Sequence, residues 1–329
     1  MSYTPTPRLR LLGEGCAAER WACALAPLAG VSRSTSEEAG AVVLAPGTAD
    51  PFARAREALQ AGLAVLWAAP FLLSPWQAAS LRDRSLREGL LLRFVEPFRH
   101  RPGFAFLRRL LSGREPFWRP LYLRTLRLAR PEDGVRIDEL ATQELACYLA
   151  LLDGRVQSVS ASAARRDEAG DVRAAFLALQ YERGPLLQCT ISLGEAMEGR
   201  QLVAAMADRT VVLDELGAVA SLRIVTTAQE CSDRVLPAAK PDALTEEAAG
   251  FLRALREGDL SYGNGERWTR VAAVWWAARQ SMSFGAPAEV PVPRQVGAQT
   301  EPPPLRVIEG GGHSVRTAGK RPALIVLTS

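Results

Sequence analysis

The order of apolar and polar positions divides the chain into two parts, and the first part alternates short apolar runs with amphipathic segments. The apolar runs predict four strands, at 8–12, 41–44, 63–67 and 90–94. The amphipathic segments predict four helices, at 19–28, 52–61, 76–88 and 103–112. Strands that alternate with helices are typical of a parallel sheet covered on both faces. We therefore predict a parallel sheet over residues 1–116.

After residue 116 the pattern changes to a run of closely spaced strands. A strand at 120–128 and an amphipathic helix at 137–152 come first. Six further strands follow, at 156–164, 174–181, 186–192, 200–207, 209–213 and 220–225. Short polar turns between strands favour an antiparallel meander, which two helices at 244–256 and 265–282 would close. This predicts an α+β domain over 117–293 with a large, open, mostly antiparallel sheet.

Composition narrows the class of protein. With 329 residues the chain can bury a large core without a metal or disulfide staple. The 40 basic and 36 acidic residues are spread along the chain, so we expect no nucleic-acid partner. The longest apolar runs are too short to span a bilayer and no signal peptide is visible, so we expect a cytoplasmic protein without a membrane partner. Residues 294–329 are rich in Pro and Gly and predict an extended tail, in which 323–327 is apolar enough to add an edge strand.

Cysteine usage excludes two kinds of site. The five cysteines, Cys16, Cys23, Cys147, Cys189 and Cys231, include no C-x-x-C pair. Their spacing argues against a disulfide framework and against a zinc site, so we expect no metal. Cys16 stands apart because a thiol at a helix N-terminus can have a lowered pKa.

A glycine motif lies between the first predicted strand and the first helix. Residues 13–18 read Gly-Glu-Gly-Cys-Ala-Ala, the G-x-G-x-x-A arrangement. Its glycines permit a tight turn and let a diphosphate approach backbone N–H groups at the helix start. Gly13, Gly15 and Cys16 are therefore candidate cofactor contacts, with a purely structural turn as the alternative. An acidic residue for an adenosine ribose is absent about 20 residues later. Arg33 and the serines beside it suit a 2′-phosphate, with a plain polar loop as the alternative.

Two stretches resemble the Gfo/Idh/MocA oxidoreductase family. They are AVVLAPGTADPFARAREALQAGLAVLWAAPF at 41–71 and REGDLSYGNGERWTRVAAVWWAARQ at 256–280, and the resemblance in the order of elements extends over 8–293. It implies a shortened Rossmann-like domain followed by the α+β domain, and an NAD(P) cofactor. Ala45, Pro46 and Pro70 then join the candidate cofactor contacts. It also implies a homo-oligomer or hetero-oligomer formed through the second sheet.

The chain departs from this family at its catalytic positions. The family's Glu-Lys-Pro is replaced by Ala68, Ala69 and Pro70, and a methyl group cannot donate a proton. The helix that carries the family's Asp-x-x-x-His reads Asp-Glu-Leu-Ala-Thr-Gln-Glu over 138–144, where Gln143 or Glu144 is nearest to the histidine. Glu144, Glu96 and His100 are the candidate substitutes. A solvated helix charge is the alternative for the first, and a surface pair for the other two.

Few side chains could replace the family's catalytic lysine and histidine, because the chain has two lysines, Lys240 and Lys320, and two histidines, His100 and His313. We therefore expect a catalytically degenerate member that acts as a partner-binding or structural subunit. Two alternatives stay open. One is an NAD(P)-dependent oxidoreductase of a small carbonyl, imine or sugar-like substrate that uses substitute residues. The other is a sensor of a nucleotide or small ligand.

Overall fold

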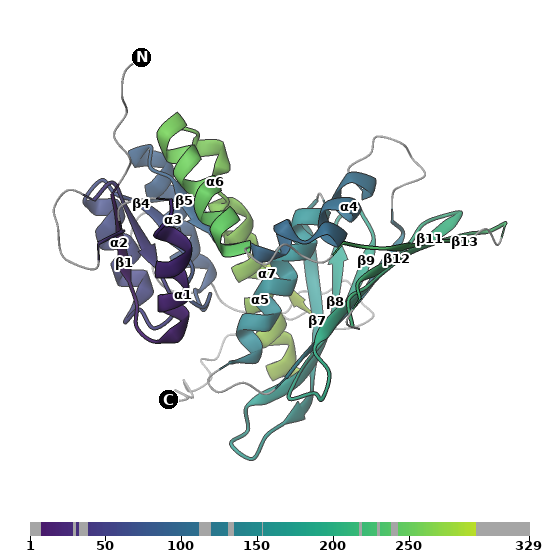
Figure 1. Ribbon diagram of the computed structural model, residues 1–329. Helices are drawn as coiled ribbons and strands as arrows, with labels where there is room; N and C mark the ends of the chain where they lie inside the picture. Colours follow the sequence, from purple (N-terminus) through teal and green to yellow (C-terminus); the bar gives the residue numbers. More distant parts are fainter. Residues whose placement is uncertain are drawn as a thin grey trace.

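The structure, a computed structural model, contains two sheets with helices between and around them (Figure 1). It describes residues 8–28, 31–32, 39–111, 120–130, 135–152, 154–216, 219–228, 231–237 and 243–293. The predicted tail at 294–329 lies outside these residues, as do Arg33, Lys240, His313 and Lys320.

The first sheet has five parallel strands in the order β2-β1-β3-β4-β5. Their bounds are β1 Leu9–Leu12, β2 Val31–Ser32, β3 Ala41–Leu44, β4 Ala64–Trp67 and β5 Leu92–Phe94. Every residue of β3, β4 and β5 is buried, as expected for parallel strands covered on both faces. The predicted Rossmann-like sheet is confirmed. β2 pairs with β1 along the edge of the sheet, and the rest of the segment on which the predicted shortening rests, 33–38, lies outside the described residues.

Local sequence signals determine where the helices around the first sheet begin. The helices are α1 Cys16–Leu25, α2 Pro51–Gln60, α3 Pro75–Glu88 and α4 Pro102–Leu111, with a 3-10 turn at Pro97–His100. The side chain of Asp50 accepts a hydrogen bond from the N–H of Ala53 at the start of α2. Ser74 and Gln77 form a reciprocal capping box at the start of α3. Because these caps satisfy N–H groups that have no partner inside a helix, both helices begin at fixed residues.

The second sheet has nine strands in the order β13-β12-β11-β10-β6-β9-β8-β7-β14. Their bounds are β6 Tyr122–Ala129, β7 Val156–Arg166, β8 Val172–Tyr181, β9 Leu186–Leu193, β10 Gly199–Ala205, β11 Arg209–Asp214, β12 Ser221–Thr226, β13 Cys231–Val235 and β14 Ala288–Glu289. The predicted large, mostly antiparallel sheet is confirmed. The expected antiparallel meander is present in two runs, β7-β8-β9 and β10-β11-β12-β13. It is not continuous, because β6 lies between β10 and β9 and pairs with β9 in parallel.

Helices α5 Ile137–Leu151 and α7 Gly265–Phe284 cover the side of the second sheet that faces the first (Figure 1). They pack against each other and against β7, β8 and β9. On the other side, none of the described helices covers the sheet in Figure 1. Among the described residues, the second sheet is therefore uncovered on one face.

Helix α6, Ala243–Glu257, follows the strands of the second sheet in the chain but packs on the first sheet. Its Phe251 and Leu252 share a core with Leu9, Leu11 and Trp21. The prediction that both late helices close the second sheet is therefore wrong for the first of them. An amphipathic pattern identifies the apolar face of a helix but not the surface that the face will cover.

Candidate functional site

A cavity of about 190 Å³ lies where the carboxyl ends of β3, β4 and β5 meet α5, α6 and α7. Ligands of open parallel sheets bind at this edge. Its walls are formed by Trp21, Pro46, Trp67, Ala68, Ala69, Pro70, Phe71, Phe94, Val95, Pro97, Glu139, Thr142, Gln143, Leu244 and Trp268. The volume is below the roughly 300 Å³ at which pockets for drug-sized ligands begin. It suits one ring or one small polar group.

The wall that follows β4 is apolar. The indole N–H of Trp67 donates to the carbonyl oxygen of Ala69 at 2.9 Å, which holds this turn against the strand. The ring of Phe71 lies 5.3 Å from that of Phe94 and 4.6 Å from that of Trp268. Ala68 and Ala69 line the cavity at the positions where the family resemblance implied Glu-Lys. This wall therefore has no side chain that can move a proton.

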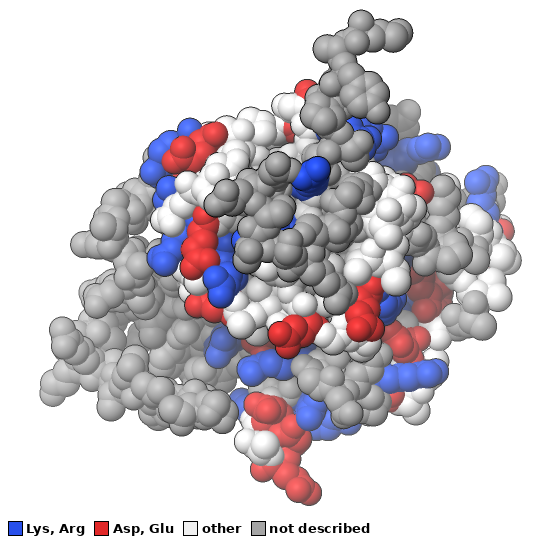
Figure 2. Space-filling model, turned by 60° about the vertical axis from the view of Figure 1, so that its left-hand side comes forward, with Lys and Arg blue, Asp and Glu red and all other residues white. Residues whose placement is uncertain are grey.

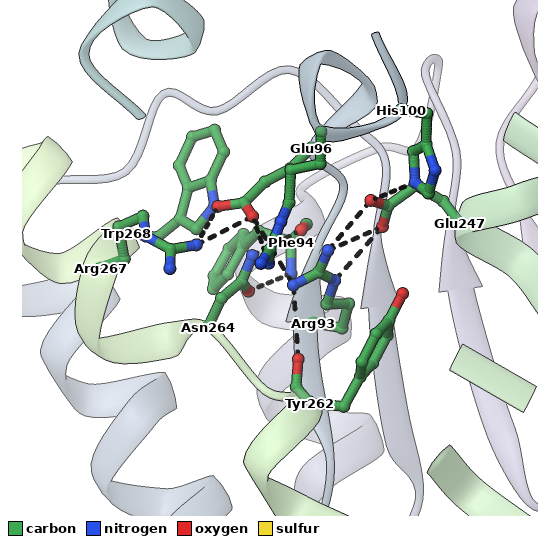
Figure 3. Close-up of polar contacts among 10 residues, drawn as sticks. Arg93, Phe94, Glu96, His100, Glu247, Tyr262, Asn264, Arg267 and Trp268 are labelled. Atoms are coloured by element: carbon green, nitrogen blue, oxygen red, sulfur yellow. Dashed lines mark hydrogen bonds and ion pairs between the residues drawn. The ribbon is translucent and has the colours of Figure 1, made fainter. Parts of the chain in front are cut away.

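Glu96, just beyond β5, is buried rather than on the surface, so the expected surface pair with His100 is wrong. Its carboxylate, 0% exposed, accepts hydrogen bonds from Arg267 at 2.8 and 2.9 Å and from the indole of Trp268 at 3.1 Å (Figure 3). Arg99 donates to it at 3.2 Å. These bonds link the end of β5 to α7, so the carboxylate of Glu96 acts as a buried structural contact.

His100 pairs with Glu247 of α6 instead. The Nε2 of His100 lies 3.0 Å from the Oε1 of Glu247, and Arg93 donates to the same carboxylate at 2.9 and 3.2 Å (Figure 3). Burial would raise the pKa of Glu247, but the hydrogen bond from His100 and the charge of Arg93 outweigh it and lower the pKa. Burial would lower the pKa of Arg93, but the charges of Glu247 and Glu96 raise it. The pair is therefore ionised and holds α6 against β5.

A further polar contact links β5 to the start of α7. The side-chain amide of Asn264 accepts from the N–H of Phe94 and donates to its carbonyl oxygen, both at 2.8 Å. Arg93 also lies 4.4 Å from the ring centroid of Tyr262, a cation–π contact. One signal in the sequence points to this network, a charged Arg93 inside an otherwise apolar strand. Two of its partners, Glu247 and Tyr262, are more than 150 residues away along the chain.

Glu144 does not face the cavity. It is 1% exposed, and its carboxylate accepts from Arg200 of β10 at 3.0 Å and from the hydroxyl of Tyr148 at 2.7 Å. Burial, with the charge of Glu144 next, raises the pKa of Tyr148 well above its ordinary value. Burial would lower the pKa of Arg200, but the charge of Glu144 raises it. Glu144 is therefore one half of a buried ion pair between α5 and the second sheet, and the structure does not bring it to the cavity.

Glu139, one turn earlier on α5, is the carboxylate that lines the cavity, together with Thr142 and Gln143. Positions three and four apart lie on one face of a helix, which places these side chains together. Burial raises the pKa of Glu139 above its ordinary value of 4.5, with a partial opposing effect from Arg136. Within the described part of the chain its carboxylate makes no hydrogen bond or ion pair. The hydroxyl of Thr142 donates to the backbone oxygen of Glu139 at 3.1 Å.

The glycine motif has one structural and one open position. Gly13 has a φ of +127°, and a Cβ there would lie 2.7 Å from the carbonyl oxygen of Pro46. This glycine is thus required by the packing of one loop on another. Gly15 has a φ of +84°, and a Cβ there would meet nothing within 4 Å. The exposed Cys16 begins α1, where no side chain caps the helix.

These residues fit part of a dinucleotide. The open space at Gly15 and the uncapped N–H groups of α1 fit a diphosphate. Pro46 and Pro70 line the cavity, whereas Ala45 is fully buried beside Pro46. The segment that would meet an adenosine ribose, 33–38, lies outside the described residues. In the described residues no three His, Cys, Asp or Glu side chains gather as a metal site would need.

Two further features bear on partners. None of the helices in the described ranges has the length and apolar character needed to cross a membrane. On the coloured part of the face in Figure 2, basic and acidic side chains are interspersed. The view shows small mixed clusters rather than one basic stripe.

The chain was compared with known proteins. No family model matches the sequence, and no curated protein matches it. Solved structures do match the fold. UDP-N-acetylglucosamine 3-dehydrogenase GnnA from Acidithiobacillus ferrooxidans superposes with a TM-score of 0.73 at 24% identity, over 84% of this chain and 98% of that one.

Two further similar structures were solved with nicotinamide cofactors. The 3-ketoreductase KijD10 from Actinomadura kijaniata, in complex with TDP-benzene and NADP, matches with a TM-score of 0.68 at 16% identity, over 84% of this chain and 98% of that one. GenD2 from gentamicin A biosynthesis, in complex with NAD, matches with a TM-score of 0.69 at 17% identity, over 89% and 98%. At these identities the likeness establishes a shared fold.

Proposed function

We propose that this chain, which has the fold of the Gfo/Idh/MocA oxidoreductases, is a member of that family that acts on a sugar-like hydroxyl or carbonyl compound with NAD(P). The observation that carries the proposal is Glu139. Its carboxylate lines the cavity beside Ala68 and Ala69, has a raised pKa, and is not committed to another described side chain. The acid that is missing after β4 is thus replaced from α5.

The residues divide the work between binding and proton transfer. NAD(P), when bound, supplies the hydride acceptor or donor. The backbone N–H groups of Gly15 and Cys16 would hold its diphosphate, and Pro46 and Pro70 would flank the part that enters the cavity. The carboxylate of Glu139 takes the proton of the substrate hydroxyl in oxidation, and its protonated form returns the proton to the carbonyl oxygen in reduction.

The surroundings of Glu139 support this role. A general acid–base works best when its pKa lies near the working pH, and burial moves the pKa of Glu139 in that direction. The apolar walls formed by Phe71, Phe94 and Trp268 exclude water and maintain that shift. Gln143, exposed one turn after Glu139, brings an amide that can donate to a substrate oxygen.

Cofactor binding is tested first, with NADH and NADPH. Energy transfer from tryptophan reports binding, because Trp21, Trp67 and Trp268 line the cavity. Turnover is then measured with NAD⁺ or NADP⁺ and UDP-N-acetylglucosamine, the compound in the name of one similar protein. Glu139→Gln is expected to lower kcat by about 10²- to 10⁴-fold with unchanged cofactor affinity. Glu257→Gln, an exposed carboxylate at the end of α6, is the control. Failure to bind either cofactor, or full turnover by Glu139→Gln, contradicts the proposal.

The second candidate is a partner-binding subunit without catalysis, and the open face of the second sheet favours it. Phe176 of β8, 46% exposed, and Leu126 of β6 both pair with Thr190 of β9, so they share that face. We infer that a second copy or a related chain packs there. Measurement of the native mass tests this. An oligomer that binds no cofactor supports this candidate over the enzyme, and cofactor binding without turnover of any substrate supports a ligand sensor.

A further inference from the structure

A second and larger hollow lies away from the cavity, between the turn that joins β7 to β8 and the helices α5 and α7. Its volume is about 780 Å³, within the roughly 300 to 1,000 Å³ of small-molecule sites. Five arginines line it, Arg136, Arg165, Arg166, Arg173 and Arg279. Three aspartates line it with them, Asp138, Asp167 and Asp171. We call this hollow the arginine groove, and we propose that it binds the diphosphate of a nucleoside diphosphate.

The arginines from β7 are positioned by backbone contacts. Arg166 donates to the carbonyl oxygen of Gly170 at 2.9 Å, and Arg165 donates to that of Leu193. Glu195 lies 3.5 Å from Arg165. Arg166 has no carboxylate partner within the described ranges. A guanidinium has five N–H donors, so these contacts fix both side chains and leave most donors available.

The arginines on the helical side share one carboxylate. Arg136 lies 3.4 Å and Arg279 4.0 Å from the oxygens of Asp138, which also accepts from the indole of Trp275 at 2.9 Å. The single negative charge of Asp138 therefore balances only one of these two positive charges. Across the groove, Arg173 pairs with Asp167 at 2.8 Å. Even when Glu195 is counted, five guanidiniums face four carboxylates, and the groove retains positive charge.

The shape and lining of the groove favour a diphosphate with a ring attached. Planar guanidiniums bind phosphate oxygens in pairs, which gives direction as well as charge. Val172, Leu193 and Met282 add apolar surface to the lining, where a base or sugar ring can pack. A flat basic surface for a membrane or a nucleic acid would not have this concave, partly apolar form.

Helix α5 lines both hollows, because Asp138 faces the groove and the next residue, Glu139, faces the cavity. Neighbouring positions on a helix point in different directions, so the groove is a separate site from the cavity. Binding of a diphosphate in the groove therefore does not depend on the proposed function.

Calorimetric titration of the full chain with UDP, uridine and inorganic pyrophosphate tests the proposal. UDP is expected to bind, with an affinity that falls as salt is raised, and uridine is expected not to bind. Arg166→Ala and Arg279→Ala should each weaken UDP binding about tenfold, because each removes charge-assisted hydrogen bonds to the phosphate oxygens. Arg54→Ala, on the exposed side of α2, should leave it unchanged.

Two results would overturn the groove as a site. The first is failure of UDP to bind at millimolar concentration. The second is binding that neither groove variant weakens, since UDP would then lie elsewhere, for example at Gly15. NADH is titrated in parallel with wild type and the groove variants and is expected to bind all of them equally. Failure of UDP to bind wild type that still binds NADH rejects the groove alone, whereas failure of both NADH and NADPH to bind wild type rejects the proposed function alone.

Discussion

Two glutamates on α5, Glu139 and Glu144, lie five residues apart and have opposite surroundings. Glu144 faces the second sheet and is bonded to Arg200 and Tyr148. Glu139 faces the cavity, and within the described residues no side chain is bonded to its carboxylate. Removing a buried, paired carboxylate leaves its partner charge uncompensated, whereas a half-buried carboxylate without a partner is free to exchange a proton. The comparison therefore supports a structural role for Glu144 and the proposed proton transfer for Glu139.

The largest effect is expected from Glu144→Ala. This change leaves the guanidinium of Arg200 buried without its partner, which costs about 3 to 5 kcal/mol of unfolding free energy. Urea denaturation followed by far-UV circular dichroism measures the loss. Glu139→Ala is the matched control on the same helix, and a change within about 0.5 kcal/mol is expected for it. If both variants lose the same free energy of unfolding, the contrast between a structural ion-paired carboxylate and an unpaired one is contradicted.

A smaller loss, about 3 kcal/mol, is expected from Glu247→Gln, because the amide retains part of the hydrogen bonding to Arg93 and His100. The pKa of Glu247 also predicts the direction in which this stability difference changes with pH. The pKa of Glu247 is lower in the folded protein than its ordinary 4.5. The stability that it contributes is therefore present above pH 4.5 and lost as the pH falls through the folded pKa. Denaturation of both proteins between about pH 3 and 7 checks this. A gap that widens toward acid would contradict the assignment.

The sequence predicts much of the fold and little of the site. Alternating strands and helices, the glycine motif and the apolar turn at Ala68–Ala69 are local features, and their patterns survive in the structure. The position of β6 between β9 and β10 and the docking of α6 on the first sheet are decided by contacts between distant segments. β13 has five exposed residues, so no apolar alternation marks it.

The sequence does not single out Glu139, for a similar reason. Helix α5 buries residues on almost every side, from Ile137 to Leu151, because it lies between the second sheet and α7. A helix that is apolar nearly all round gives no period that identifies one solvent-facing side. Its polar positions therefore cannot be sorted into cavity-facing and sheet-facing sets without knowing both neighbours.

The proposed function depends most directly on the protonation of Glu139. It is measured by ¹³C NMR of side-chain carboxyl groups in protein labelled at glutamate, with Glu139→Gln identifying the resonance by its absence. The carboxyl is predicted to titrate above its ordinary pKa of 4.5. A raised folded pKa also means that the stability contributed by this group is present below pH 4.5 and lost as the pH rises through the folded value, so Glu139→Gln should gain stability relative to wild type toward neutral pH. A carboxyl that titrates at or below 4.5 would contradict the assignment of Glu139 as the acid of the cavity.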